Sequence, residues 1–110
     1  MLREDFFIQS EIRKMLIRSN INYSKMDFGT VKGVVYFRGI FQITPPKPQM
    51  DEKEIERVTV NTLYSFEKKI RSIPGVSDIV FQFTNWRKQR GQWFPVKPKE
   101  LKGEDGKQDS

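Results

Sequence analysis

Bases and aromatic rings are interleaved along residues 86–99, which we call the arm, and no acidic side chain occurs in it. Indole rings favour a membrane interface, and lysine and arginine attract anionic headgroups. The same side chains suit single-stranded nucleic acid, because rings stack on bases while cations meet phosphates. A third interpretation is structural: Trp93 and Phe94 fold back over an open sheet, and the bases are solvated. The predicted binding residues are Trp86, Arg87, Lys88, Arg90, Trp93 and Lys97.

The chain lacks the side chains that most often carry out catalysis. It contains no histidine and no cysteine, so the commonest general base and every thiolate ligand are missing. Carboxylates remain, among them Asp5, Glu11, Asp27 and Glu67, but no spacing among them indicates a site. We therefore predict a protein that is not an enzyme and that holds no cofactor and no catalytic metal.

Charge indicates the kind of partner. The formal net charge is +6, and the positive charge is concentrated in residues 1–50 and in the C-terminal quarter. We expect an anionic membrane surface or a protein partner, with nucleic acid as the second choice. The N-terminus has no apolar run of signal-peptide length, so we expect a cytoplasmic protein, or a periplasmic one if a leader was removed.

Two amphipathic helices are predicted to support the arm. Apolar residues recur at helical spacing along residues 4–19. A second helix over residues 51–72 starts at a capping box in which Asp51 and Glu54 are three residues apart. Pro74 disfavours helical geometry in the residue before it, so this helix is expected to end near residue 72.

Three strands are predicted from alternating side chains, over residues 22–31, 33–43 and 76–84. The first two are joined by a connection too short for a parallel crossover, so they form an antiparallel hairpin. The middle strand has one apolar face and one mixed face. Gly39 interrupts the apolar face, and we expect it to lie where another backbone, a helix or a ligand comes close, with a helix as the first choice.

The middle strand and the turn after the second helix together resemble the BON domain, the bacterial osmotically induced and nodulation domain. The strand positions that carry the resemblance are Gly33, Val35, Phe37, Gly39 and Phe41. The turn positions are Pro74, Gly75 and Val76. The resemblance covers residues 5–84. The chain departs from the family in the last strand, where the family often has an asparagine and this chain has Phe81 and Gln82.

The element order and this resemblance predict an α+β fold. It is α-β-β-α-β, with a three-stranded mixed sheet covered on one face by two helices, and the aromatic, basic arm follows. Residues 1–98 form a single BON-like domain, and residues 99–110 a disordered polar tail. The resemblance implies a non-enzymatic module that binds phospholipid surfaces or other ligands, and it gives Gly33, Gly39, Pro74 and Gly75 structural roles. A free sheet edge allows a homodimer.

Overall fold

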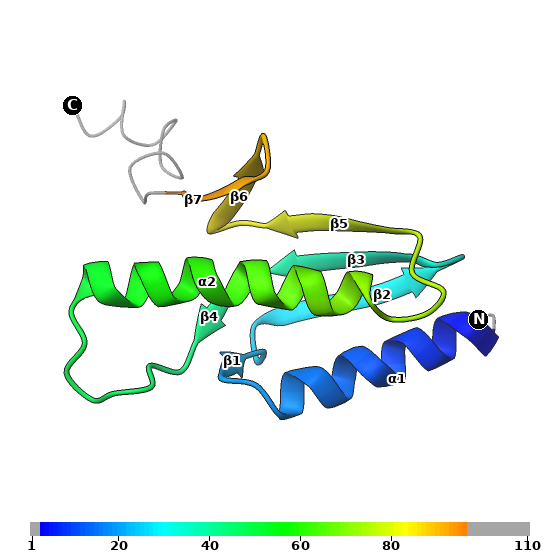
Figure 1. Cartoon of the computed structure of the whole chain (residues 1–110), viewed down its shortest axis with the longest axis horizontal. Helices are drawn as coiled ribbons and strands as arrows, with labels where there is room; N and C mark the ends of the chain where they lie inside the picture. The colour runs from blue at the N-terminus through cyan, green and yellow to red at the C-terminus, as the bar shows by residue number, and fades with distance from the viewer. Residues whose placement is uncertain (1–2, 97–110) are drawn as a thin grey trace.

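The computed structural model describes residues 3–96, and the elements follow one another as α-β-β-β-β-α-β-β-β (Figure 1). The bounds are α1 Arg3–Ile17, β1 Ile21–Asn22, β2 Met26–Val31, β3 Val34–Gly39, β4 Gln42–Ile43, α2 Glu52–Arg71, β5 Asp78–Phe83, β6 Trp86–Gln89 and β7 Gln92–Pro95. Lys97 and the predicted tail lie outside the described residues.

The central sheet has the strand order β2-β3-β5. β3 runs antiparallel to β2 and parallel to β5, with Phe37 opposite Phe28 on one side and Phe81 on the other. The parallel pair is possible because the 20-residue helix α2 carries the chain back between β3 and β5. The predicted α+β fold with a three-stranded mixed sheet is confirmed.

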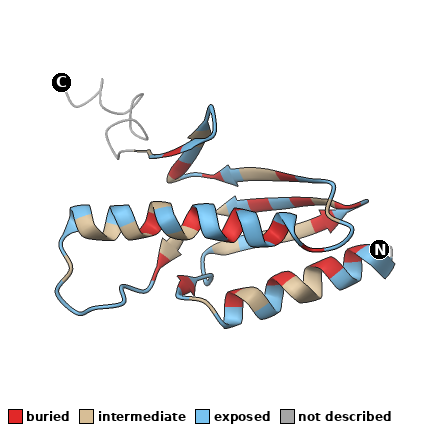
Figure 2. Cartoon of the chain, in the orientation of Figure 1, coloured by how far each residue is buried: buried red, intermediate tan, exposed pale blue. Residues whose placement is uncertain are grey.

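Both helices cover the same face of this sheet. The buried stripes of α1 (Ile8, Ile12, Leu16) and of α2 (Leu63, Phe66, Ile70) join one core cluster with the β3 side chains Val35 and Phe37 (Figure 2). The other face of the sheet is open: Tyr36 and Arg38 of β3 are exposed there. The cluster extends past the central sheet to Trp86 and Trp93, so the arm contributes to the core.

α2 begins and ends where the sequence places its signals. Asp51 accepts a hydrogen bond from the Glu54 backbone, and the Glu54 carboxylate accepts one from the Asp51 backbone, which completes the capping box. Ser72 is the C-cap. Pro74 and Gly75 then occupy the two central positions of a turn closed by a hydrogen bond of 3.2 Å from the Val76 amide to the Ile73 carbonyl.

The predicted strand over residues 33–43 is wrong in its length, because β3 ends at Gly39. Gly39 has a φ of 100°, and a Cβ atom there would overlap the carbonyl oxygen of Lys25. The expected neighbour was a helix, whereas the structure puts the backbone that leads into β2 against this glycine. A left-handed residue cannot continue a regular strand, so the chain bends away here.

The predicted strand over residues 22–31 also divides, at the same level of the sheet. Its first part, β1, pairs with β4, where Ile21 lies opposite Ile43. Between β1 and β2, the Lys25 carbonyl accepts a hydrogen bond of 2.9 Å from the Ile40 amide. The side chain of Asn85 then substitutes for a strand backbone. Its Oδ1 accepts from the Phe41 amide at 3.0 Å, and its Nδ2 donates to the Phe41 carbonyl at 2.8 Å.

The turn between β2 and β3 is held by the first helix. Lys32 and Gly33 both have positive φ, which matches the two-residue turn that suits a twisted hairpin. Asp5 is buried, and its carboxylate accepts hydrogen bonds from the amides of Lys32 at 2.9 Å and Gly33 at 2.8 Å. A Cβ atom on Gly33 would lie 2.7 Å from the carbonyl oxygen of Gly75, so the turn also packs tightly against the loop before β5.

Neither helix of residues 3–96 is long and apolar enough to cross a membrane. β2 and β5 are the two edges of the central sheet. A homodimer through one of these edges stays a prediction.

Candidate anion-binding face of the C-terminal hairpin

Residues 86–95 of the arm form a β-hairpin of β6 and β7, which was not predicted from the sequence. Arg90 and Gly91 form the two-residue turn with φ values of 51° and 78°, the same conformation as Lys32 and Gly33. The sequence therefore contained a signal for this hairpin, because Arg90 is followed by a glycine that favours a two-residue turn between the two strands. Lys88 concealed the alternation, because a cation occupies the face that the two tryptophans share.

The inner face of the hairpin is part of the core. Trp86 and Trp93 are 8% and 5% exposed, and the Trp93 ring meets the Phe81 ring edge-on at a centroid distance of 4.9 Å. The Trp93 ring packs against Phe81 and Phe83, which belong to β5 at the edge of the central sheet. Both indoles are buried in this conformation, which favours the structural interpretation that the sequence left open for Trp93 and extends it to Trp86.

Lys88, also predicted as a binding residue, points inward and meets a buried carboxylate. Its Nζ donates to Oε2 of Glu67, which also accepts from Nε and Nη2 of Arg71 at 3.2 and 3.1 Å. Burial raises the pKa of Glu67, but the hydrogen bonds from Lys88 and Arg71 outweigh it and hold the pKa below its ordinary value. A further bond, from the Tyr64 hydroxyl to the Gly91 carbonyl at 3.0 Å, ties the hairpin turn to α2.

The outer face of the hairpin is exposed and carries no negative charge. Arg87 lies opposite Phe94, and Gln89 lies opposite Gln92, so these four side chains share one face, with Arg90 at its tip. Phe94 is 44% exposed, which shows that it does not fold back as Trp93 does. We call Arg87, Gln89, Arg90, Gln92 and Phe94 the outer face.

A shallow depression follows this surface, lined by Gln89, Arg90, Gln92 and Phe94. Within residues 3–96, neither Arg87 nor Arg90 has a carboxylate within ion-pair distance. The arrangement offers two guanidinium groups, two amides and one ring to a partner. Guanidinium groups bind phosphate oxygens in a fork, and the ring can contact an apolar or aromatic group.

The structure thus divides the predicted binding residues. It brings Arg87 and Arg90 to the outer face and assigns Trp86, Lys88 and Trp93 to packing. The outer-face residues that sequence reasoning left out are Gln89, Gln92 and Phe94. They could have been found from the turn, since opposite residues of a hairpin share a face.

No family model, no curated protein and no solved structure matches this chain. The resemblance to the BON domain is therefore carried by the sequence motifs alone.

The pairing of Glu67 leads to a pH-dependent prediction. We expect Glu67→Gln to lower the free energy of unfolding by about 1–2 kcal/mol near neutral pH, because two cations lose a charged acceptor and both are partly exposed. A lowered folded-state pKa stabilises the fold above the ordinary value of 4.5 and loses that contribution as pH falls through the folded pKa. The difference in unfolding free energy between wild type and variant should therefore narrow below pH 4.5 in urea unfolding curves.

A constant difference in unfolding free energy down to strongly acidic pH would contradict the role of Glu67 as a charged acceptor for Lys88 and Arg71. Glu56→Gln, on an exposed position of the same helix, is the control and should have little effect.

Proposed function

We propose that this chain is a non-enzymatic binding module that attaches to anionic phospholipid surfaces through the outer face of the hairpin. The observation that carries the proposal is the exposed pairing of Arg87 with Phe94 on a surface free of acids. Arginine near a surface of anionic lipid contributes about 1 kcal/mol of attraction. An aromatic ring beside it suits the boundary between headgroups and acyl chains.

Two further observations support a binding role over catalysis. Residues 3–96 include no group of three or more carboxylates placed to hold a metal ion. Glu67, the carboxylate whose pKa is shifted there, is held in its charged form by two cations and is therefore poorly suited to donate a proton at neutral pH. The sequence resemblance to the BON domain points in the same direction, because that family shares no catalytic residues.

Sedimentation with lipid vesicles tests the proposal. We expect the chain to bind phosphatidylglycerol vesicles and to leave phosphatidylcholine vesicles unbound at the same ionic strength. The double variant Arg87→Gln/Arg90→Gln should weaken binding about thirtyfold, which corresponds to about 2 kcal/mol for two bases. The variant Phe94→Ser should weaken binding as well, without a change in melting temperature.

A matched control separates the outer face from net charge. Lys53→Gln/Arg57→Gln removes the same charge from exposed positions of α2, and it should change binding by less than about threefold. Equal losses in the two double variants would show that only net charge matters. Negligible binding to both kinds of vesicle would reject the lipid proposal and leave the protein partner that the sequence also allows.

Single-stranded nucleic acid is the second candidate, and the same surface supports it. A base stacked on Phe94 would place its neighbouring phosphates near Arg87 and Arg90. In a fluorescence titration with a labelled oligonucleotide, the logarithm of the affinity should fall linearly with the logarithm of the salt concentration. A flat dependence on salt removes this candidate.

A further inference from the structure

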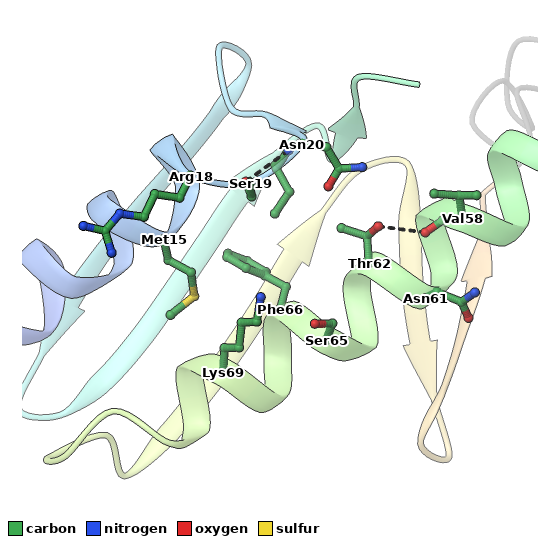
Figure 3. A pocket seen from close by; sticks show the side chains of 11 residues that line it. Met15, Arg18, Ser19, Asn20, Val58, Asn61, Thr62, Ser65, Phe66 and Lys69 are labelled. Carbon is green, nitrogen blue, oxygen red and sulfur yellow. Dashed lines mark hydrogen bonds between the residues drawn. The ribbon is translucent and has the colours of Figure 1, made fainter. Parts of the chain in front are cut away.

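A second site lies away from the hairpin, between the C-terminal turn of α1 and the middle of α2. The two helices leave a cavity of about 380 Å³ there, open to solvent (Figure 3). Its apolar lining comes from Met15, Ile21, Val58 and Phe66. Ile21 and Phe66 are 5% and 3% exposed and belong to the core cluster, so the floor of this interhelical groove is apolar and held in place by the core.

The two charged residues of the groove are both cations, and they lie on opposite sides of it. Arg18 follows the end of α1, and Lys69 lies in the last turns of α2, where Figure 3 shows its chain extending towards the space that Met15 enters from the other helix. The lining includes no carboxylate. In the part of the chain that the structure describes, neither Arg18 nor Lys69 is within ion-pair distance of an acidic group.

The lining has three hydroxyl groups, and within residues 3–96 those of Ser19 and Thr62, unlike that of Ser65, already donate to backbone carbonyls. Ser19 donates to the Leu16 carbonyl at 2.9 Å, and Thr62 donates to the Val58 carbonyl at 2.8 Å. The charge of a ligand would therefore be met by Arg18 and Lys69, while its apolar part would lie on Phe66 and the residues around it.

The pocket at the other end of α2 does not share the positive lining of this groove. A second cavity of about 490 Å³ borders the first turns of α2, and its charged lining residues are Glu52 and Glu56, with no base. One helix thus offers an anionic pocket near its start and a cationic groove towards its end. This contrast makes the sign of the charge a testable property of the groove.

We propose that the interhelical groove binds a small amphipathic carboxylate, a negatively charged group at the end of a short hydrocarbon chain. A volume of this size lies in the range of small-molecule sites, which are mostly apolar with a few polar groups that fix orientation. The carboxylate pairs with Arg18 and Lys69, and the chain displaces water from the apolar floor. This site shares no residue with the outer face of the hairpin.

Three probes separate the two parts of the proposal in titrations followed by amide chemical shifts of the full chain. Octanoate carries both charge and chain, octanol only the chain, and acetate only the charge. We expect octanoate to saturate, below its micelle concentration, with the largest shifts at Asn20, Asn61 and Ser65. Octanol and acetate should bind at least about tenfold more weakly. Equal binding of octanoate and acetate, or of octanoate and octanol, would overturn the proposal, as would shifts confined to the hairpin.

Variants test the residues themselves. Arg18→Gln/Lys69→Gln should weaken octanoate binding at least about tenfold and bring it to the level of octanol. Lys53→Gln/Arg57→Gln removes equal charge from α2 outside the groove, and should leave octanoate binding within about twofold. Ser65→Trp places an indole in the groove while keeping both cations, and it should abolish binding, with the melting temperature as a check that each variant folds. Unchanged binding in Arg18→Gln/Lys69→Gln, or in a folded Ser65→Trp, would overturn the proposal.

Discussion

Trp93→Ala is expected to lower the free energy of unfolding by about 3–5 kcal/mol, whereas Phe94→Ala is expected to lower it by less than about 1 kcal/mol. Trp93 is buried against Phe81 and Phe83, and its loss leaves a cavity beside the edge strand β5. Phe94 is its neighbour in the chain but points to the other face of the hairpin and is 44% exposed. Urea unfolding followed by far-ultraviolet circular dichroism measures both values.

The pair also distinguishes a structural arm from a binding arm. If Trp93→Ala left stability unchanged, the indole would have to be free of the core, and the binding interpretation of the tryptophans would be restored. Trp93→Phe serves as the milder control. Within residues 3–96, the indole Nε1 is buried without a hydrogen-bond partner, so replacing the ring by phenylalanine removes no bond and should cost only the difference in buried area.

Gly39→Ala is expected to cost about 4 kcal/mol of stability or more, and Gly39→Val little beyond that. A single Cβ atom already overlaps the Lys25 carbonyl oxygen, and the φ of 100° is strained for any other residue. Alanine already suffers both the steric overlap and the backbone strain, so the larger valine adds little. If a helix were the obstacle, as the sequence suggested, alanine would be mild and valine severe.

Gly29 provides the control for this prediction. It lies on β2, has no positive φ, and a Cβ atom there would meet nothing within 4 Å. We expect Gly29→Val to be neutral or stabilising by up to about 1 kcal/mol, since valine favours strands. Thermal unfolding of the three variants side by side measures the difference. A melting temperature of Gly39→Ala equal to that of wild type would show that the bend after β3 does not depend on this glycine.

The elements that the sequence predicted well are those whose signals are local. α2 has a capping box at its start and Pro74 beyond its end, and each signal acts within four residues of the position it defines. Alternation placed Val35 and Phe37 on the buried face of β3 for the same reason. The open face, with Tyr36 and Arg38, follows from the same period.

The features that the sequence did not reveal depend on residues far apart. Lys88 looked like a surface cation because its partner Glu67 lies 21 residues earlier. The sequence indicated no structural role for the Asp5 carboxylate, because the turn that it binds lies 27 residues later in the chain. Gly39 ends β3 because of the backbone of Lys25, and alternation contains no information on the φ of a glycine.

The candidate site was predicted in part. The sequence pointed to the arm as a basic surface, and Arg87 and Arg90 are exposed in the structure. The sequence left both a binding and a structural interpretation open for the tryptophans of the arm, since composition does not say which rings pack against the sheet. Phe94 became the exposed ring because successive residues of a strand point to opposite faces and Trp93 takes the inner one.

The parallel pairing of β3 with β5 constrains the order in which this chain can fold. The hairpin of β6 and β7 is local and can close within microseconds, but the rings on which Trp93 rests belong to β5. β5 reaches β3 only after the long crossover through α2 is closed, a step that carries most of the loop-closure entropy. We therefore expect the C-terminal hairpin to dock last, and folding kinetics to be insensitive to Trp93 while unfolding is accelerated by its loss.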